Sequence, residues 1–188
     1  MTDIAAQHRQ ALGATRRLVA GIDPRQWTEP TPCADWNVGE LLNHVVGGNW
    51  WAAELAGGAT IDEVGSRLDG DQLGEDALDA YDRSAEVAAA AFEAPGALDA
   101  PCAVSYGPVP GSVYAGHRLI DVLIHGWDLA VATGQDRTID PVLVDACWGV
   151  VEPQAELLRG SGMFGGDISL PARADPQARL LAALGRRP

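Results

Sequence analysis

The stretch that decides the fold of this chain is residues 117–135, HRLIDVLIHGWDLAVATGQ. Within this otherwise apolar run, His117, Asp121 and His125 recur at intervals of four, and Asp128 follows seven residues after Asp121. Residues four apart lie one turn above each other on the same face of an α-helix. A polar stripe on an apolar helix is costly to bury unless a partner satisfies it, and a metal ion is one such partner. The stretch therefore predicts a buried helix that carries a candidate metal site.

Length and composition indicate one globular domain. The chain has 188 residues, of which 47% are hydrophobic and 21% charged, enough for one sizeable core. No repeat or linker divides it, so we expect a single domain over residues 1–188. No apolar run has the length of a membrane span, and the N-terminus lacks the pattern of a signal peptide, which together favour a cytoplasmic location.

Charge and cysteine usage exclude several classes of function. The net charge of −13 argues against nucleic acid or an anionic membrane as a partner, because both would repel an acidic surface. Cys33, Cys102 and Cys147 form no C-x-x-C pair, so neither a disulfide framework nor a thiolate zinc site is indicated. We expect reduced thiols that are mostly buried. Cys33, close to a predicted helix start, is open to a second interpretation as a reactive thiol.

Two helices are predicted before the central stretch. Apolar residues at helical spacing predict a first amphipathic helix over residues 3–21, and a proline-rich loop follows it. A second helix is predicted over about residues 36–55 and ends at a pair of glycines. Asn37 and Glu40 have the spacing of a capping box at its start, and Asp35 is a competing cap.

The middle of the chain leads into the central helix. Residues 59–76 are acidic and rich in glycine, which predicts a loop or a short irregular helix, and residues 76–93 are an alanine-rich third helix. Residues 98–111 contain YGPVPG, which is typical of a short strand and turn. The central helix then covers about residues 112–133, with Gly134 as its stop.

Start signals in the C-terminal part predict two further helices. Asp140 and Asp175 each precede a proline, a pattern typical of a helix start, and Pro153 should kink or end the first of these helices. A short extended piece is predicted near residues 168–170. The pattern as a whole predicts an all-α fold, an antiparallel helical bundle with short extra helices and a minor β or irregular segment.

Bundles build metal sites from side chains on facing helices, so Asp121 and His125 need a partner from another helix. His44, in the middle of the second predicted helix, is the best candidate, and His8, in a polar stretch near the terminus, is weaker. Two imidazoles and one carboxylate leave a coordination position for water or substrate, as in catalytic zinc sites. The same donors also admit Fe, Ni, Mn or Co, and any of these would make bound water or thiol a usable nucleophile.

Simpler interpretations stay open for every one of these residues. Asp121 and His125 can hydrogen-bond to each other on a helix without any metal. His44 can be an ordinary core or surface histidine. Asp128 can orient a ligand or accept a bond from a backbone or indole N–H. His117 can line the mouth of the site or lie exposed at the start of the helix.

The segments TPCADWNVGELLNHVVGG and HGWDLAVATGQ together resemble an actinobacterial family related to the metal-binding N-terminal domain of mycothiol-dependent maleylpyruvate isomerase, in the DinB-like superfamily. The tail RLLAALGRRP resembles the end of stand-alone members, so the resemblance covers nearly the whole chain. It implies an up-and-down four-helix bundle with a divalent metal, often zinc, in its core. By position, the resemblance implies His44, Asp121 and His125 as ligands. The isomerase has glutamate at the position of Asp121 and a further C-terminal domain, so we do not extend the resemblance to maleylpyruvate isomerisation itself.

Three hypotheses of function follow. The first is an enzyme that uses His44, Asp121 and His125 as metal ligands and catalytic centre, with zinc preferred over nickel or iron, and that acts as a thiol-dependent (mycothiol-type) transferase or isomerase on small electrophiles. A homodimer is compatible with it. The second is a non-catalytic metal-binding bundle, a sensor or interaction module, whose site His117 or Asp128 closes as a fourth ligand. The third is a ferrous oxygenase, in which two histidines and one carboxylate bind iron. It is disfavoured because such triads usually lie on β-barrels, and the sequence predicts too few strands.

Overall fold

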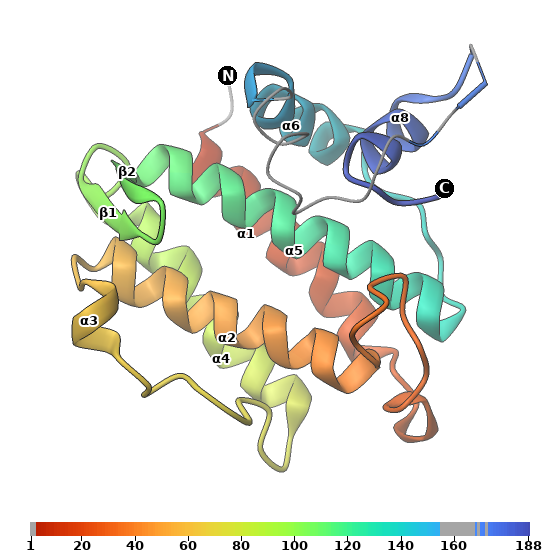
Figure 1. Ribbon diagram of the computed structural model, residues 1–188, viewed down its shortest axis with the longest axis horizontal. Coiled ribbons are helices and arrows are strands. Elements are labelled where there is room, and N and C mark those ends of the chain that lie inside the picture. Colours follow the sequence, from red (N-terminus) through yellow and green to blue (C-terminus); the bar gives the residue numbers. More distant parts are fainter. Residues whose placement is uncertain (1–2, 155–167, 169, 172) are drawn as a thin grey trace. The chain divides into compact units, whose positions relative to one another are not determined.

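The computed structural model in Figure 1 describes residues 3–154, 168, 170–171 and 173–188. The chain divides into two compact units, Met1–Arg137 and Thr138–Pro188. The first unit contains a bundle of long helices and a small hairpin, and the second contains shorter helices. The expectation of a single domain over residues 1–188 stays a prediction.

Four helices form the bundle of the first unit, and three of them begin at a side-chain cap. Asp3 caps the first, Asn37 and Glu40 form the expected capping box of the second, and Asp76 caps the third. Each cap accepts bonds from backbone N–H groups that have no partner within the helix. The helices are α1 (Ile4–Ala20), α2 (Val38–Ala56), α4 (Ala77–Glu93) and α5 (Gly111–Thr133).

The central helix α5 ends as its sequence predicts. Gly134 has a φ of 70°, in the left-handed region that favours glycine, and its N–H bonds the carbonyls of the last turn. At the other end α5 begins at Gly111, one residue before the predicted start and without a side-chain cap. A Cβ on Gly111 would lie 2.0 Å from the carbonyl oxygen of Ala97, so only glycine fits where the helix starts.

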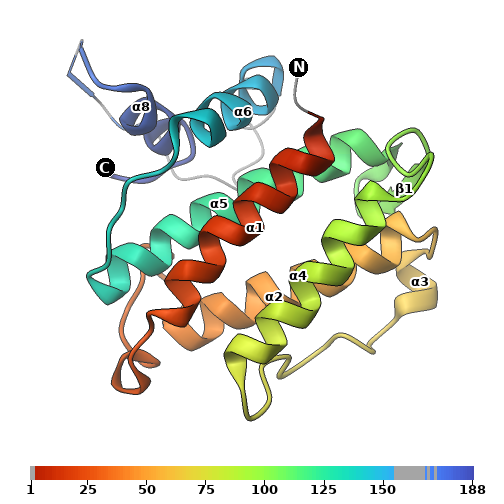
Figure 2. The same cartoon turned by 180° about the vertical axis from the view of Figure 1, so that it is seen from behind.

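One hydrophobic cluster shows the directions of the four helices. It joins Ala5 and Tyr114, from the starts of α1 and α5, to Leu55 and Phe92, from the ends of α2 and α4. Helices α1 and α5 therefore run one way and α2 and α4 the other, as Figures 1 and 2 show. Around the bundle, α1 packs against α5 and α4, and α2 packs against α4 and α5.

The predicted four-helix bundle is confirmed, with a different connectivity. The resemblance implies an up-and-down order, whereas the observed order is up, down, down, up. The difference arises in residues 57–76, which contain the short helix α3 (Ile61–Val64). Because this connection is long, it returns along the whole bundle and lets α4 start at the same end as α2. As a result α2 and α5 are antiparallel neighbours.

The predicted strand and turn before α5 is a two-stranded antiparallel hairpin, β1 (Pro101–Val104) and β2 (Gly107–Pro110). The sequence predicted one strand and a turn, whereas the prolines of YGPVPG, Pro108 and Pro110, lie within the second strand. Gly107 makes the turn between the strands with a φ of 112°.

The core of the first unit consists of large apolar side chains from the four long helices. Burial of one such side chain stabilises the fold by about 1.5–3 kcal/mol relative to exposure. No helix in the described residues is both long enough and apolar enough to span a membrane. The largest fully buried side chains on these helices include Tyr81, Phe92, Leu41, Leu42, Leu119, Ile124 and Leu129.

The second unit contains α6 (Pro141–Val151), the 3₁₀ turn η2 (Glu152–Gln154) and α8 (Pro176–Ala183). Asp140 and Asp175 cap α6 and α8 with a proline in the first turn, as predicted. Helix α6 ends just before Pro153, which agrees with the expected break. The predicted extended piece at residues 168–170 includes residue 169, which lies outside the described residues.

Candidate metal centre

His44 enters the site from the middle of α2. Its neighbours Leu41, Leu42 and Val45 are fully buried, so they hold this turn of α2 against the core. The indole of Trp36 stacks on the His44 ring with centroids 4.5 Å apart, which restricts the imidazole to one orientation. The ring is thereby turned toward α5.

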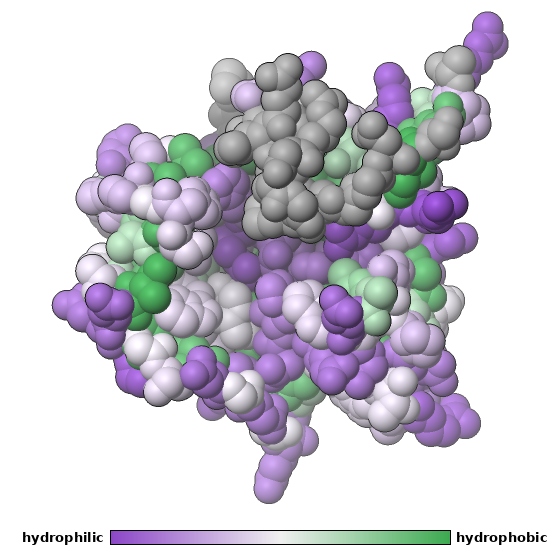
Figure 3. Space-filling model, viewed as in Figure 1, coloured by the Kyte–Doolittle hydropathy of each residue, from purple (hydrophilic) through white to green (hydrophobic). Residues whose placement is uncertain are grey.

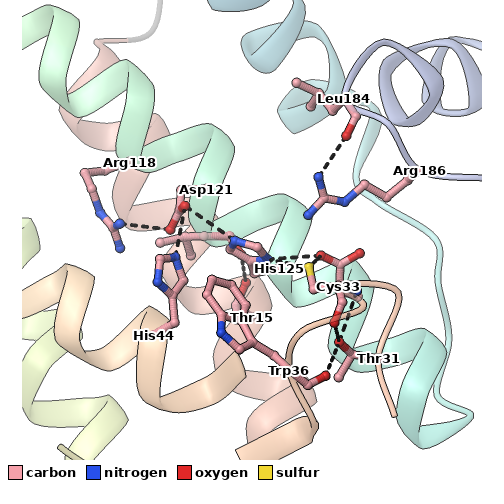
Figure 4. Close-up of polar contacts among 12 residues, drawn as sticks. Thr15, Thr31, Cys33, Trp36, His44, Arg118, Asp121, His125, Leu184 and Arg186 are labelled. Atoms are coloured by element: carbon pink, nitrogen blue, oxygen red, sulfur yellow. Dashed lines mark hydrogen bonds and ion pairs between the residues drawn. The ribbon is translucent and has the colours of Figure 1, made fainter. Parts of the chain in front are cut away.

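Asp121 and His125 lie one turn apart on α5 and face His44 (Figure 4). The Nε2 atom of His44 is 3.4 Å from Asp121 Oδ1, and the Nε2 atom of His125 is 3.5 Å from the same oxygen. The two imidazoles meet edge to face with centroids 5.0 Å apart. The structure therefore brings together the three residues that the sequence proposes as ligands, from two helices.

These separations suit ligands of one cation better than hydrogen bonds. Zinc binds nitrogen and carboxylate oxygen at about 2.0–2.2 Å, so two ligands at a tetrahedral angle lie roughly 3.3–3.6 Å apart. A hydrogen bond between the same atoms is typically about 2.7–3.2 Å long. The donor atoms of His44, Asp121 and His125 all lie within 4.8 Å of one another. The residues present therefore fit a divalent cation with nitrogen and oxygen ligands.

Solvent reaches this group of donors from one side. The side chains are 36% exposed for His44, 28% for Asp121 and 11% for His125. In Figure 3 hydrophilic residues gather near the centre of the visible face, beside the middle of α2. A small molecule therefore has access to the position between His44 and Asp121.

Arg118 holds the second oxygen of Asp121. Its Nη1 donates to Asp121 Oδ2 over 2.8 Å, and its Nη2 donates to Asn49 Oδ1 over 3.2 Å. The guanidinium is buried and reaches this place only because residue 48 is glycine: a Cβ on Gly48 would lie 2.4 Å from Nη1. The bond leaves Oδ1 of Asp121 facing the two imidazoles.

Asp128 holds the other nitrogen of His125. Its buried carboxylate oxygen Oδ2 lies 3.0 Å from His125 Nδ1 and also accepts the thiol of Cys33 over 3.2 Å. A carboxylate on Nδ1 selects the tautomer whose Nε2 is available to a metal, the usual arrangement behind metal-binding histidines. The structure thus gives Asp128 a histidine and a thiol among its partners, whereas the sequence suggested a backbone or indole N–H.

The charges around the cluster shift the pKa values of Asp121 and His125 in opposite directions. Burial alone would raise the pKa of Asp121, but Arg118 together with the two imidazoles lowers it well below its usual range. Burial alone would lower the pKa of His125, but Asp121, Asp128 and Cys33 together raise it to about 11. Without a cation, His125 is therefore an imidazolium held between two carboxylates.

Residues 8–130 match the family described as "Mycothiol maleylpyruvate isomerase N-terminal domain". The chain belongs to this family. The matched range includes all of α2 and α4, α1 from residue 8 and α5 up to residue 130, and His44, Asp121 and His125 all lie within it.

Two relatives in this family come from Mycobacterium tuberculosis, strains CDC 1551 / Oshkosh and ATCC 25618 / H37Rv. Both are uncharacterised proteins, each 38% identical over 184 residues, with 95% of this chain and 95% of the relative covered. Among solved structures, the chain resembles a variant of the mycothiol-dependent maleylpyruvate isomerase with a TM-score of 0.58 and 15% identity, covering 85% of this chain and 72% of that one. This structural similarity confirms the fold class that was predicted for this chain.

Two other histidines of this family member lie away from the cluster. His117 is bonded to the hydroxyl of Tyr106, in the turn of the hairpin, over 2.5 Å. His8 is completely buried against Phe92 in the core of the bundle. Neither joins a group of metal-ligating side chains within the described residues, so the structure supports the low rank given to His8.

Sequence reasoning missed Arg118, Asn49 and Trp36 as parts of the site. Arg118 precedes Asp121 by three residues, a spacing that places the two side chains on one helix face, so a signal was present. The contribution of Asn49 and the stacking of Trp36 depend on α2 packing beside α5, which a single sequence does not display. Cys33 was considered as a reactive thiol, without its contact to Asp128.

Proposed function

We propose that this protein is a divalent-metal enzyme that uses a low-molecular-weight thiol of the mycothiol type as a transferase or isomerase of small electrophiles. The single observation that carries the proposal is the convergence of His44, Asp121 and His125 from two helices, with 3.4 and 3.5 Å between donor atoms. The name of the family, and the mycothiol-dependent enzyme that shares the fold, support the choice of thiol. We place the activity in the cytoplasm, where thiols are kept reduced.

The donor set determines the metal and its chemistry. Two neutral imidazoles and one carboxylate favour zinc and also admit nickel or iron. A divalent cation at this position keeps a coordinated thiol in its thiolate form at neutral pH, which is the nucleophile that such reactions need.

The residues around the cation position have distinct tasks. Asp128 holds the Nδ1 proton of His125, so that Nε2 presents its lone pair toward the cation. Arg118 offsets the charge of Asp121, so a divalent cation there retains a net positive field, which favours an anionic sulfur ligand. The indole of Trp36 covers one face of His44 and keeps water from that side of the ring.

Open coordination favours catalysis over a purely structural site. Within the described residues, no fourth Asp, Glu, His or Cys donor joins His44, Asp121 and His125. The residues considered for that place have other partners, since His117 bonds Tyr106 and Asp128 faces the opposite nitrogen of His125. A closed, non-catalytic site would need such a ligand, so it is the less favoured alternative.

The proposal is tested by metal content and thiol chemistry in the same preparations. Elemental analysis of the full-length protein is expected to find a stoichiometric divalent metal, with at least one equivalent lost in both His44→Ala and His125→Ala. Mycothiol conjugation to an activated aryl halide is expected to depend on that metal. His117→Ala, the same substitution on the same helix outside the cluster, is the matched control and should retain both properties.

Two results would contradict the proposal. If His44→Ala and His125→Ala keep the metal content of the unsubstituted protein, the assignment of the ligands is wrong. If the metal-loaded protein neither binds mycothiol nor accelerates the conjugation, the non-catalytic alternative replaces the enzyme. Binding and turnover are therefore measured separately on the same sample.

A further inference from the structure

His125 has a second group of donors on the opposite side of its ring. Its Nδ1 lies 3.0 Å from Asp128 Oδ2 and 3.7 Å from Cys33 Sγ, and that sulfur lies 3.2 Å from the same oxygen of Asp128. The donor atoms of these three residues, like those of the first group, lie within 4.8 Å of one another. Figure 4 shows Cys33 on the loop before α2, on the far side of His125 from His44.

We propose that Cys33, Asp128 and Nδ1 of His125 form a second cation site, and that the His125 ring bridges it to the first. Its occupant is a thiophilic divalent cation such as Zn²⁺, Co²⁺ or Cd²⁺. The inference rests on the proposed function only for the first cation, which binds Nε2 of His125. The second site, at Cys33, can be measured separately.

The observed separations agree with one cation among the three donors. With zinc–sulfur bonds of about 2.3 Å and zinc–nitrogen or zinc–oxygen bonds of about 2.0–2.2 Å, tetrahedral geometry places sulfur roughly 3.5–3.7 Å from its neighbours and nitrogen roughly 3.3–3.5 Å from oxygen. The 3.7 Å between sulfur and nitrogen matches these values, whereas 3.2 and 3.0 Å are hydrogen-bond distances, so Asp128 Oδ2 would move about 0.3 Å from each partner when a cation binds. Small rotations of the three side chains complete the fit.

The net charge of this buried site does not change when a divalent cation replaces two protons. Binding a divalent cation displaces the thiol proton of Cys33 and the Nδ1 proton of His125, and metal–sulfur and metal–nitrogen bonds replace the S–H and N–H bonds. Two positive charges leave as protons and two enter with the cation, so the net charge near Asp128 does not change. The usual obstacle to a buried ion, an uncompensated charge in a medium of low dielectric constant, is therefore absent.

Cys33 differs from the other two cysteines in ways that suit this role. Cys102 and Cys147 are buried as apolar core residues and join no group of metal-ligating side chains within the described part of the chain. Cys33 is only partly buried, so a cation can reach it from solvent. Its sulfur also makes this group softer than the nitrogen and oxygen donors of the first site, so the two sites differ in metal preference.

The test is a Co²⁺ titration of the metal-free full-length protein. Equilibrium dialysis gives the number of cobalt ions bound per chain, and near-ultraviolet absorption reports thiolate-to-cobalt charge transfer. We expect two cobalt ions per chain and a charge-transfer band for the unsubstituted protein. Cys33→Ser is expected to lose the band and one of the two ions, and Asp128→Asn to weaken the band. Cys102→Ala is the matched cysteine control and should keep both.

The histidine variants separate this inference from the proposed function. His44→Ala should lose the ion without a sulfur ligand and retain the charge-transfer band, whereas His125→Ala should lose both ions. Absence of the band at saturating Co²⁺, or a Cys33→Ser isotherm identical to that of the unsubstituted protein, would overturn the second site. Unchanged binding in His44→Ala would instead overturn the first site and leave the Cys33 result standing.

Discussion

His8 and His125 are two histidines buried in the same bundle, with 0% and 8% of the whole residue exposed, and they have opposite surroundings. His8 packs edge-on against Phe92, and neither of its ring nitrogens has a hydrogen-bond partner within the described residues. Burial and the charge of Arg118 lower the pKa of His8 to about 3. For His125 two carboxylates and a thiol overcome burial and raise the pKa to about 11. Burial alone therefore does not make a functional histidine, and the oxygens placed around the ring decide its charge.

The largest expected effect separates the two histidines by metal content. His125→Ala removes a ligand that both proposed sites share, so we expect complete loss of bound metal. His8→Leu replaces an unpartnered polar ring with an apolar side chain and should keep the metal. Elemental analysis gives the metal content of both variants, and circular dichroism checks that both are folded. Metal loss in His8→Leu would contradict the assignment of His8 as a core residue outside the metal site.

Removing the carboxylate behind His125 makes its surroundings more like those of His8. Asp128→Asn keeps the shape of the side chain but no longer favours the tautomer with Nε2 available, so the affinity for the first cation should fall about 10–100-fold. Competition with a metal chelator of known affinity measures this change. Glu86→Gln, a carboxyl-to-amide change on the exposed surface of α4, is the control. An unchanged affinity in Asp128→Asn would remove Asp128 from the site.

Acid should destabilise the protein through His8. The pKa of His8 is about 3 in the folded protein, and the ordinary histidine value of 6.5 applies in the unfolded chain. Between these two pH values the unfolded chain therefore binds more protons than the folded protein. The free energy of unfolding therefore falls as the pH drops below 6.5, and this one residue accounts for about 2 kcal/mol at pH 5. Urea unfolding at pH 7.5 and pH 5 should show a smaller loss in His8→Leu than in the unsubstituted protein. Equal losses would mean that His8 finds a partner when it is charged.

The pH dependence of metal binding tests the surroundings of His125 without any substitution. His125 holds a proton up to a pKa of about 11 in the metal-free protein, and a cation on its Nε2 must displace that proton. Metal affinity should therefore rise with pH, by about tenfold per unit between about pH 6 and pH 8 if one proton is displaced. Calorimetric titrations in buffers of different ionisation enthalpy count the protons released. A flat profile would show that His125 is already neutral without metal.

The elements that the sequence predicts well are those with local signals. The Asn37–Glu40 capping box, the Gly134 stop and the proline after Asp140 each act within a few residues, and each lies where it was expected. The spacing of Asp121 and His125 is local in the same sense, because a helix alone places them on one face. The candidate ligand set therefore needed only one residue from another helix, His44, and its role as a ligand stays a prediction.

Features that depend on long-range packing were not predictable in this way. The contact of Cys33 with Asp128 joins residues 95 positions apart, and no periodicity reports it. The burial of Arg118 depends on a missing Cβ at Gly48 on another helix. The order of the helices depends on the path of residues 57–76, whose local signals predict a loop or a short helix and not a direction along the bundle. Each of these follows from how α2 and α5 meet, a property of the assembled bundle.

The antiparallel contact between α2 and α5 has a consequence for folding. His44 and Asp121 are 77 positions apart in the chain, and a cation that binds both acts as a reversible cross-link across that span. A cation that binds only the native bundle stabilises it by an amount that grows with the logarithm of the free metal concentration above the dissociation constant. On the proposed function, metal supply would therefore affect the resistance of the protein to heat and proteolysis, as well as the completeness of its site.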